Sequence, residues 1–118
     1  MSASCMQVNR QDDLIVVEFA EETDLNALEM DRIRSELYEL VEGNENCRML
    51  LDFSNVAYAS SQALGCLVTL RLKAARTGAR LAIAAIRPTL ADIISMTHLD
   101  TLFEIYPTRD EALAKLGD

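Results

Sequence analysis

The sequence predicts an α/β fold in which a mostly parallel sheet of about five strands is covered by four helices. Strand-like and helix-like segments alternate along the 118 residues in the order β-β-α-β-α-β-α-β-α. Two strand-like segments, residues 49–53 and 81–86, are almost wholly apolar. Such runs are typical of parallel strands that are buried on both faces.

The first two strand-like segments are residues 5–9 and 14–20, which a polar turn connects. The second contains Leu, Ile, Val and Phe, which favour strands. We therefore expect an antiparallel hairpin at one edge of the sheet.

A polar loop at residues 21–24 leads to the first helix. Asn26 with Glu29 three residues later resembles a capping box, and Gly43 is a typical helix end. One face of this helix is marked by apolar residues at three- and four-residue spacing, namely Met30, Ile33, Leu37 and Leu40.

We expect residues 55–61 to be a connector and the second helix to run from Gln62 to Gly78. Its helical spacing is carried by Leu64, Leu67, Val68, Leu72 and Ala75. Pro88 suits the first turn of a third helix, whose predicted inward residues are Leu90, Ile93 and Ile94. Residues 102–106 form a short strand-like segment. The Thr-x-x-Glu sequence at Thr108 then opens a last helix that contains Leu113 and Leu116.

Length and composition predict one folded domain over residues 1–118, because half of the residues are hydrophobic and a quarter are charged. The net charge of −8 disfavours binding to nucleic acid or to an anionic membrane surface. No apolar run approaches the roughly 20 residues that cross a bilayer. The N-terminus lacks the basic and apolar segments of a secretory signal. We therefore expect a cytoplasmic protein with no membrane insertion.

Few residues have the chemistry of an enzyme site. The cysteines, Cys5, Cys47 and Cys66, are odd in number and far apart, which favours reduced thiols over disulfides or a zinc site. His98 is the single histidine, so we expect it to cap a helix end rather than bind a metal. A Gly-rich phosphate loop, a nucleophile elbow and a Cys-x-x-Cys pair are all missing from the sequence. We predict no enzyme activity, no cofactor and no metal.

Two adjacent serines, Ser60 and Ser61, stand where a buried strand gives way to the second helix. Either hydroxyl is suited to cap that helix. A helix N-terminus also presents free N–H groups and the positive end of a dipole. A phosphate added there would be tolerated locally.

The sequence resembles the STAS domains, which include the bacterial anti-sigma factor antagonists. The resemblance covers essentially the whole chain and rests on LLDFSNV at 50–56, SSQALG at 60–65, GARLAI at 78–83, the Pro88 helix, HLDTLFEIYP at 98–107 and DEAL at 110–113. It implies the STAS fold. Ser61 falls on the family's phosphoacceptor and Asp24 on the acidic residue beside it. Ser60 replaces a common aspartate, and Gln62 with Ala63 replaces a pair of a small residue and glycine.

This resemblance implies a protein that binds an anti-sigma factor, often a serine kinase, and thereby frees a sigma factor. Phosphorylation at Ser61, with Ser60 as second choice, would break the complex, and a phosphatase would restore it. The implied partner-binding residues are Asp24, Asn26, Ser60, Ser61, Gln62 and Leu64. Two alternatives stay open: a non-switching STAS module, acting as a signalling scaffold or as a transporter-complex subunit, and a sensor of nucleotides or other small ligands.

Overall fold

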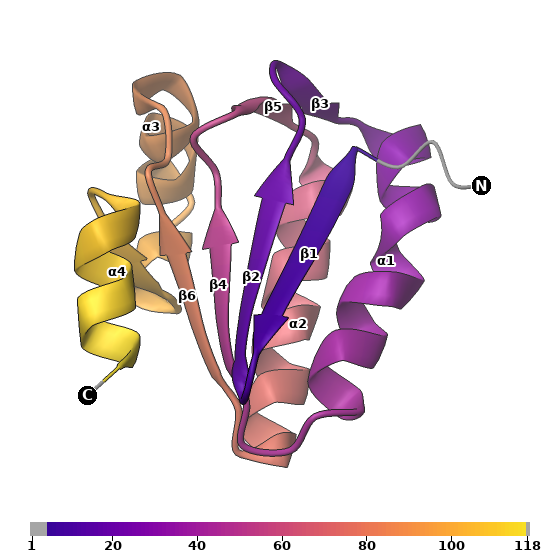
Figure 1. Cartoon of the computed structure of the whole chain (residues 1–118). Coiled ribbons are helices and arrows are strands. Elements are labelled where there is room, and N and C mark those ends of the chain that lie inside the picture. Colours follow the sequence, from indigo (N-terminus) through magenta and orange to yellow (C-terminus); the bar gives the residue numbers. More distant parts are fainter. Residues whose placement is uncertain (1–4, 118) are drawn as a thin grey trace.

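The computed structural model describes residues 5–117 and contains a five-stranded mixed sheet in the order β1-β2-β4-β6-β7 (Figure 1). Strand β1 (Met6–Gln11) pairs antiparallel with β2 (Leu14–Phe19) at one edge. Strands β4 (Arg48–Asp52), β6 (Arg80–Ala84) and β7 (Glu104–Tyr106) continue the sheet in parallel. The predicted α/β class and the edge hairpin are confirmed.

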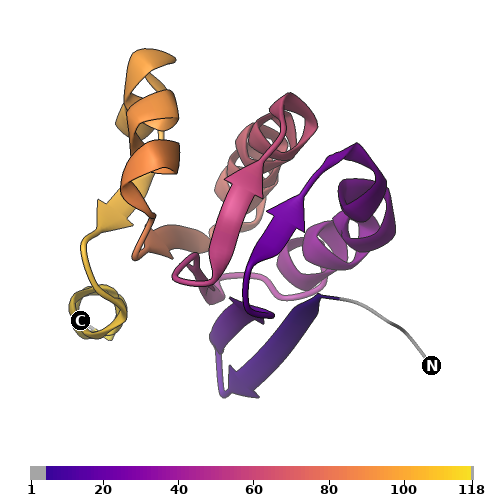
Figure 2. The same cartoon turned by 90° about the horizontal axis from the view of Figure 1, so that it is seen from above.

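Helices cover both faces of this sheet. Helices α1 (Ala27–Glu42) and α2 (Ser61–Thr77) lie side by side on one face, and α4 (Arg109–Leu116) lies on the other (Figures 1 and 2). Helix α3 (Pro88–Met96) and the short 3₁₀ helix η1 (Leu99–Thr101) connect β6 to β7. The structure thus contains the four predicted α-helices.

The alternation of side chains along the central strands divides the core into two layers. In β4, Met49 and Leu51 belong to the large cluster under α1 and α2, whereas Leu50 belongs to a smaller cluster under α4. Both faces of β4 are therefore buried, which explains its apolar run. In the larger cluster the rings of Phe19 and Phe53 meet edge to face, with centroids 5.7 Å apart.

The predicted helix signals are present as local contacts. The side chain of Asn26 accepts a hydrogen bond from the Glu29 N–H, and Thr108 does the same for Glu111. Gly78 ends α2 in a left-handed conformation with φ 73°. Residues with a Cβ are strained at this positive φ, so the turn favours glycine.

Two segments for which the sequence predicts loops contain strands in the structure. The loop at residues 21–24 leads into β3 (Thr23–Leu25), and the connector at residues 55–61 contains β5 (Val56–Ala59). They pair in parallel as a separate two-stranded sheet. Each is too short for a periodic signal, and their pairing joins segments about thirty residues apart, so local sequence could not reveal it.

The buried faces of three helices also differ from the predicted ones. In α1 the buried residue near the end is Val41, while Leu40 is half-buried. In α3, Ile93 is 40 % exposed. In α2 the inward face consists of Ala63, Cys66, Leu67, Leu70 and Ala74. Leu72 and Ala75 are therefore exposed. Apolar residues occupy both sides of α2, so spacing alone could not select the inward one.

Candidate functional site

The two short strands bring the N-termini of α1 and α2 together. Asp24 of β3 is the register partner of Tyr58 in β5, and Leu25 is the partner of Ala59. Each strand runs directly into a helix cap, Asn26 for α1 and Ser60 for α2. Figures 1 and 2 show β3 and β5 side by side at the end of the molecule where both helices begin. The two helix starts therefore share one surface.

Ser60 is the buried anchor of this arrangement, with an exposed fraction of 8 %. Its Oγ accepts a hydrogen bond from the Ala63 N–H at 3.2 Å and donates one to the Leu25 carbonyl oxygen at 2.9 Å. The Ser60 backbone N–H also donates to the Leu25 oxygen, at 3.0 Å. One side chain thus caps α2 and ties it to the strand that leads into α1.

Ser61 is the first residue of α2, and it is exposed. Its hydroxyl donates to Oε1 of the neighbouring Gln62 across a long 3.4 Å. The first turn of α2 contains no acidic residue. An anion on Ser61 would therefore meet the positive end of the helix dipole without a like charge from its own turn.

The surface around Ser61 combines polar and apolar side chains. Among the predicted partner-binding residues, the exposed ones are Asp24, Asn26, Ser61 and Gln62, while Leu64 is half-buried and Ser60 is buried. Two further exposed side chains were not predicted: Tyr58 is 52 % exposed and Leu28 is 64 % exposed. The sequence signal for Tyr58 is a large aromatic residue in a connector, residues 55–61, whose other members are Asn, Val, Ala and Ser. We call Asp24, Asn26, Leu28, Tyr58, Ser61 and Gln62 the Ser61 surface.

An ion pair and hydrogen bonds outside the Ser61 surface hold the loop before β3 in place. Glu22 forms an ion pair with Arg87 at 2.8 Å, and Arg87 also donates to the Ser54 carbonyl oxygen at 3.1 Å. The hydrogen bond and the charge of Arg87 lower the pKa of the Glu22 carboxyl. The Thr23 N–H donates to the Asn55 oxygen at 2.9 Å. The backbone that carries Asp24 is thus held from two neighbouring loops.

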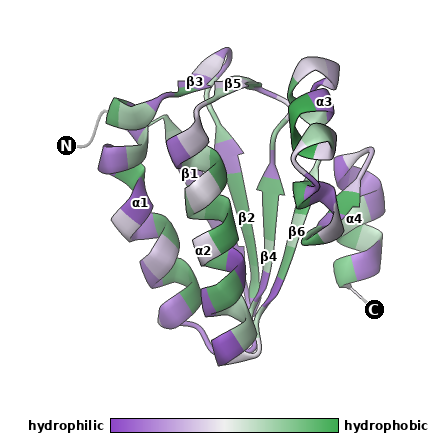
Figure 3. Ribbon diagram, turned by 180° about the vertical axis from the view of Figure 1, so that it is seen from behind, coloured by the Kyte–Doolittle hydropathy of each residue, from purple (hydrophilic) through white to green (hydrophobic). Residues whose placement is uncertain are grey.

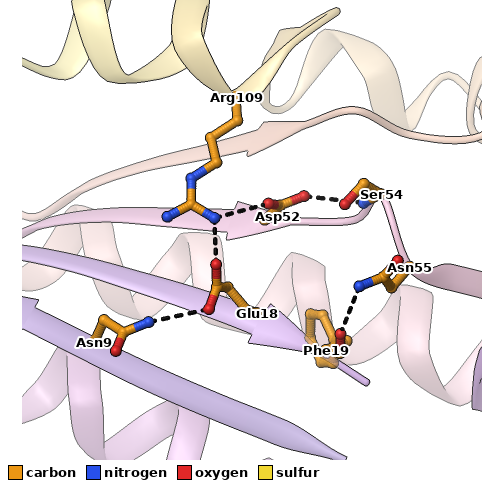
Figure 4. Close-up of polar contacts among 7 residues, drawn as sticks. All are labelled: Asn9, Glu18, Phe19, Asp52, Ser54, Asn55 and Arg109. Atoms are coloured by element: carbon orange, nitrogen blue, oxygen red, sulfur yellow. Dashed lines mark hydrogen bonds and ion pairs between the residues drawn. The ribbon is translucent and has the colours of Figure 1, made fainter. Parts of the chain in front are cut away.

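A polar cluster lies between the sheet and helix α4, on the face of the sheet that α1 and α2 do not cover (Figure 4). Arg109 at the start of α4 donates to Glu18 and, at 3.2 Å, to Asp52. Asp52 also accepts from the Ser54 N–H at 3.0 Å, and Glu18 accepts from Asn9 at 3.1 Å. Hydrogen bonding to Glu18 raises the pKa of Arg109 against the opposing effect of desolvation. Because every charged group here has a partner, we assign the cluster to holding α4 on the sheet.

Other reactive side chains lie outside the Ser61 surface. Cys47 and Cys66 are buried, and burial raises the pKa of both thiols. His98 is exposed and lies in a left-handed turn just after α3. Within residues 5–117, three or more potential metal-ligating side chains nowhere come close enough to hold an ion. None of the helices in the same range has the length and apolar character to cross a membrane.

Comparison with known proteins assigns the family. The model of the STAS domain matches residues 6–112. This chain belongs to the STAS domain family. The predicted resemblance is therefore confirmed, and the Ser61 surface is a feature of a STAS domain.

Solved structures of other STAS domains share the fold. An anti-sigma-factor antagonist STAS protein from Planctomyces limnophilus superposes with a TM-score of 0.87 at 21 % identity, over 96 % of this chain and 98 % of that one. The Bacillus cell fate determinant SpoIIAA, solved in its phosphorylated form, gives a TM-score of 0.71 at 14 % identity over 94 % and 98 %.

The fold also occurs within a transporter. The murine anion transporter Slc26a9 contains a region that matches 92 % of this chain, with a TM-score of 0.76 at 13 % identity, although the match covers only 18 % of that protein. At such identities these likenesses establish the shared STAS fold, which regulators and transporters both use.

Proposed function

We propose that this STAS domain is an anti-sigma factor antagonist that binds its anti-sigma factor through the Ser61 surface and is released when Ser61 is phosphorylated. The observation that carries the proposal is the contrast between the two serines. Ser61 is exposed at the start of α2, whereas Ser60 is buried and already hydrogen-bonded. The anti-sigma factor antagonists among the similar structures, one of which was also solved in a phosphorylated form, support this role.

The contacts of the two serines favour Ser61 as the acceptor. A kinase must reach the hydroxyl and must bring a phosphate to it. The Ser60 oxygen lies between Ala63 and Leu25, so its modification would break both the cap and the link to β3. Ser61 contributes only a long contact to Gln62, and its phosphate would project into solvent.

Charge repulsion supplies the release step in this proposal. A phosphoserine carries a charge of about −1.5 to −2 at neutral pH. Asp24 on the adjacent strand is exposed, so a partner that covers both side chains would have to bury two anions. An unpaired charge within an interface typically costs about 2–5 kcal/mol. That range corresponds to roughly 30-fold to several-thousand-fold in affinity.

The switching cycle then needs partners but no chemistry from this chain. A serine kinase, which is the anti-sigma factor itself in the simplest case, transfers the phosphate, and a phosphatase removes it. The chain acts in the cytoplasm as the substrate and binding partner of these enzymes, without a cofactor. In this cycle the chain supplies the Ser61 hydroxyl as phosphate acceptor and the Ser61 surface as the binding site for the partner.

The test uses the purified anti-sigma factor kinase from the genome that encodes this chain. We expect wild-type protein and Ser61→Ala to bind it with similar affinity, and Ser61→Asp to bind at least about 30-fold more weakly in calorimetric titration. Incubation with ATP followed by peptide mass spectrometry should place one phosphate on Ser61 and none on Ser61→Ala. Equal binding by all three proteins would refute the electrostatic switch. If Ser61→Ala still gains one phosphate, the acceptor is a residue other than Ser61.

A non-switching role is the second candidate, because the same fold occurs in the Slc26a9 transporter. In that role the Ser61 surface would hold a scaffold or a transporter subunit permanently. Stable complex formation with a transporter component encoded beside this chain, unaffected by Ser61→Asp, would favour it over switching.

A further inference from the structure

Helix α2 has a second apolar face, which points away from the core. Five residues spaced alternately by four and three form this outer stripe: Ser61, Gly65, Val68, Leu72 and Ala75. Leu72 is 53 % exposed, and only Val68 of the five is half-buried. Alternating spacing of three and four is the pattern by which one helix packs against another. The stripe begins at Ser61 itself.

Gly65 gives an independent reason to place another molecule on this stripe. Glycine inside a helix destabilises it relative to alanine. A Cβ at Gly65 would meet no atom within 4 Å, so packing within residues 5–117 does not require the glycine. A residue without a side chain does permit the close approach of a second backbone.

The charge of α2 indicates the chemistry of that molecule. The helix carries Arg71, Lys73 and Arg76 and no acidic residue, although the chain as a whole has a net charge of −8. Lys73 pairs with Glu42 at 2.8 Å. Within residues 5–117, Arg71 and Arg76 form no ion pair. The outer stripe is therefore flanked by cations suited to acidic side chains of a partner.

A groove of about 380 Å³ continues this surface beside α2. Arg71 and Ala75 form part of one wall, and Leu102 and Phe103 form part of the other. Figure 3 views the molecule from this side and shows more apolar colour along α2 than along the neighbouring α1. The groove can receive apolar side chains from a helix that lies along the stripe.

We propose that the outer stripe of α2 docks an amphipathic helix of the anti-sigma partner, with apolar residues toward Leu72 and acidic residues toward Arg71 and Arg76. This inference rests on the proposed function and extends its interface beyond the Ser61 surface. A helix seated on the stripe passes over Gly65 and reaches Ser61 at the N-terminal end. Phosphate on Ser61 would then stand in the path of the docked helix.

The experiment titrates variants with the purified anti-sigma factor kinase of the same genome. Leu72→Asp should weaken binding by about tenfold or more, while the matched control Met96→Asp, which changes an exposed apolar residue of α3, binds as wild type. Gly65→Ala should raise the melting temperature and yet weaken binding, a combination that a purely structural role would not produce.

Charge substitutions test the acidic flank of the partner. Arg76→Glu should weaken binding and reduce its dependence on salt. The control Lys115→Glu changes a basic residue at the same place in α4 and should have no effect.

The outcomes separate this inference from the proposed function. If Ser61→Asp weakens binding but the Leu72, Gly65 and Arg76 variants bind like wild type, the helix-docking proposal is wrong and the switch stands. If the unmodified protein does not bind the kinase, both proposals fail. If the chain alone sediments as a dimer that Leu72→Asp dissociates, the stripe belongs to a second copy and the proposal is overturned.

Discussion

The hydroxyl of Ser60 donates a hydrogen bond to the carbonyl oxygen of Leu25 at 2.9 Å, although the two residues are 35 positions apart. The same oxygen atom of Ser60 accepts from the Ala63 N–H. This pair of contacts fixes where α2 begins relative to β3. It also determines which of two adjacent serines faces solvent.

Replacement of Ser60 should therefore destabilise the protein, whereas replacement of Ser61 should not. Ser60→Ala removes the α2 cap and leaves the Leu25 oxygen with one hydrogen bond fewer, so we expect a loss of about 1–3 kcal/mol in the free energy of unfolding. Ser61→Ala should change it by less than about 0.5 kcal/mol. Urea denaturation measures both. Similar losses for the two variants would contradict the assigned roles.

A negative charge on Ser61 should leave the domain folded. In Ser61→Asp the carboxylate lies at the N-terminus of α2, where the helix dipole favours it by about 0.3–1 kcal/mol. Thermal unfolding should show an unchanged or slightly higher melting temperature. A clear decrease would mean that phosphorylation releases the partner by loosening the fold instead of by charge repulsion.

Removal of Arg109 should weaken the attachment of α4. The Arg109→Met substitution leaves Asp52, whose side chain is only 10 % exposed, without its cationic partner. We expect a loss of about 1–3 kcal/mol in the free energy of unfolding. Arg34→Met, which breaks an exposed pair with Asp31, is the control and should cost less than about 1 kcal/mol. Equal losses of unfolding free energy in the two variants would show that the contacts of Arg109 with Glu18 and Asp52 stabilise the fold no more than an exposed ion pair does.

The Arg80–Glu104 pair between β6 and β7 should make the free energy of unfolding decrease at acidic pH. Hydrogen bonds from Arg80 hold the pKa of the Glu104 carboxyl below its ordinary value of 4.5. A carboxyl with a depressed pKa stabilises the fold above 4.5, and this contribution disappears as the pH falls through the folded-state pKa. Both side chains are more than a third exposed, so we expect less than about 1 kcal/mol.

The control for this acid dependence is Arg80→Met. Unfolding free energies measured between pH 7 and pH 3 should fall less steeply in Arg80→Met than in wild type. Identical curves for the two proteins would show that the pair contributes nothing in this window.

The three thiols should be unreactive in the native protein. Burial raises the pKa of Cys47 and Cys66. Burial and the neighbouring Glu29 raise the pKa of Cys5 to about 11. At pH 8 about one Cys5 in a thousand would then be a thiolate. Alkylation by iodoacetamide, followed by peptide mass spectrometry, should be slow for all three and fast after denaturation. Rapid labelling of Cys66 in the native protein would contradict its burial in the core.

The sequence was sufficient for the features that depend on neighbouring residues. The caps at Asn26 and Thr108, the glycine turn at Gly78 and the apolar run of β4 each involve contacts within a few positions or a simple alternation. Such signals survive in a linear sequence because their physical cause is local. The STAS motif at residues 60–65 could also be recognised from the sequence, because its residues are contiguous.

The sequence was not sufficient where two distant segments meet. The pairing of Asp24 with Tyr58, the exposure of Leu28 and the choice of inward face on α2 all depend on long-range packing. Leu67 and Leu72 fit helical spacing equally well, and only contact with the sheet buries the first and exposes the second.

By itself, then, the amino-acid sequence determined the four α-helices and the five strands of the main sheet in their order along the chain, and the place where two serines meet a helix start. Only the tertiary structure decided that Ser60 is buried and Ser61 exposed. The physical reason is the Leu25 carbonyl: an acceptor supplied by a remote strand draws one hydroxyl inward and leaves its neighbour facing solvent.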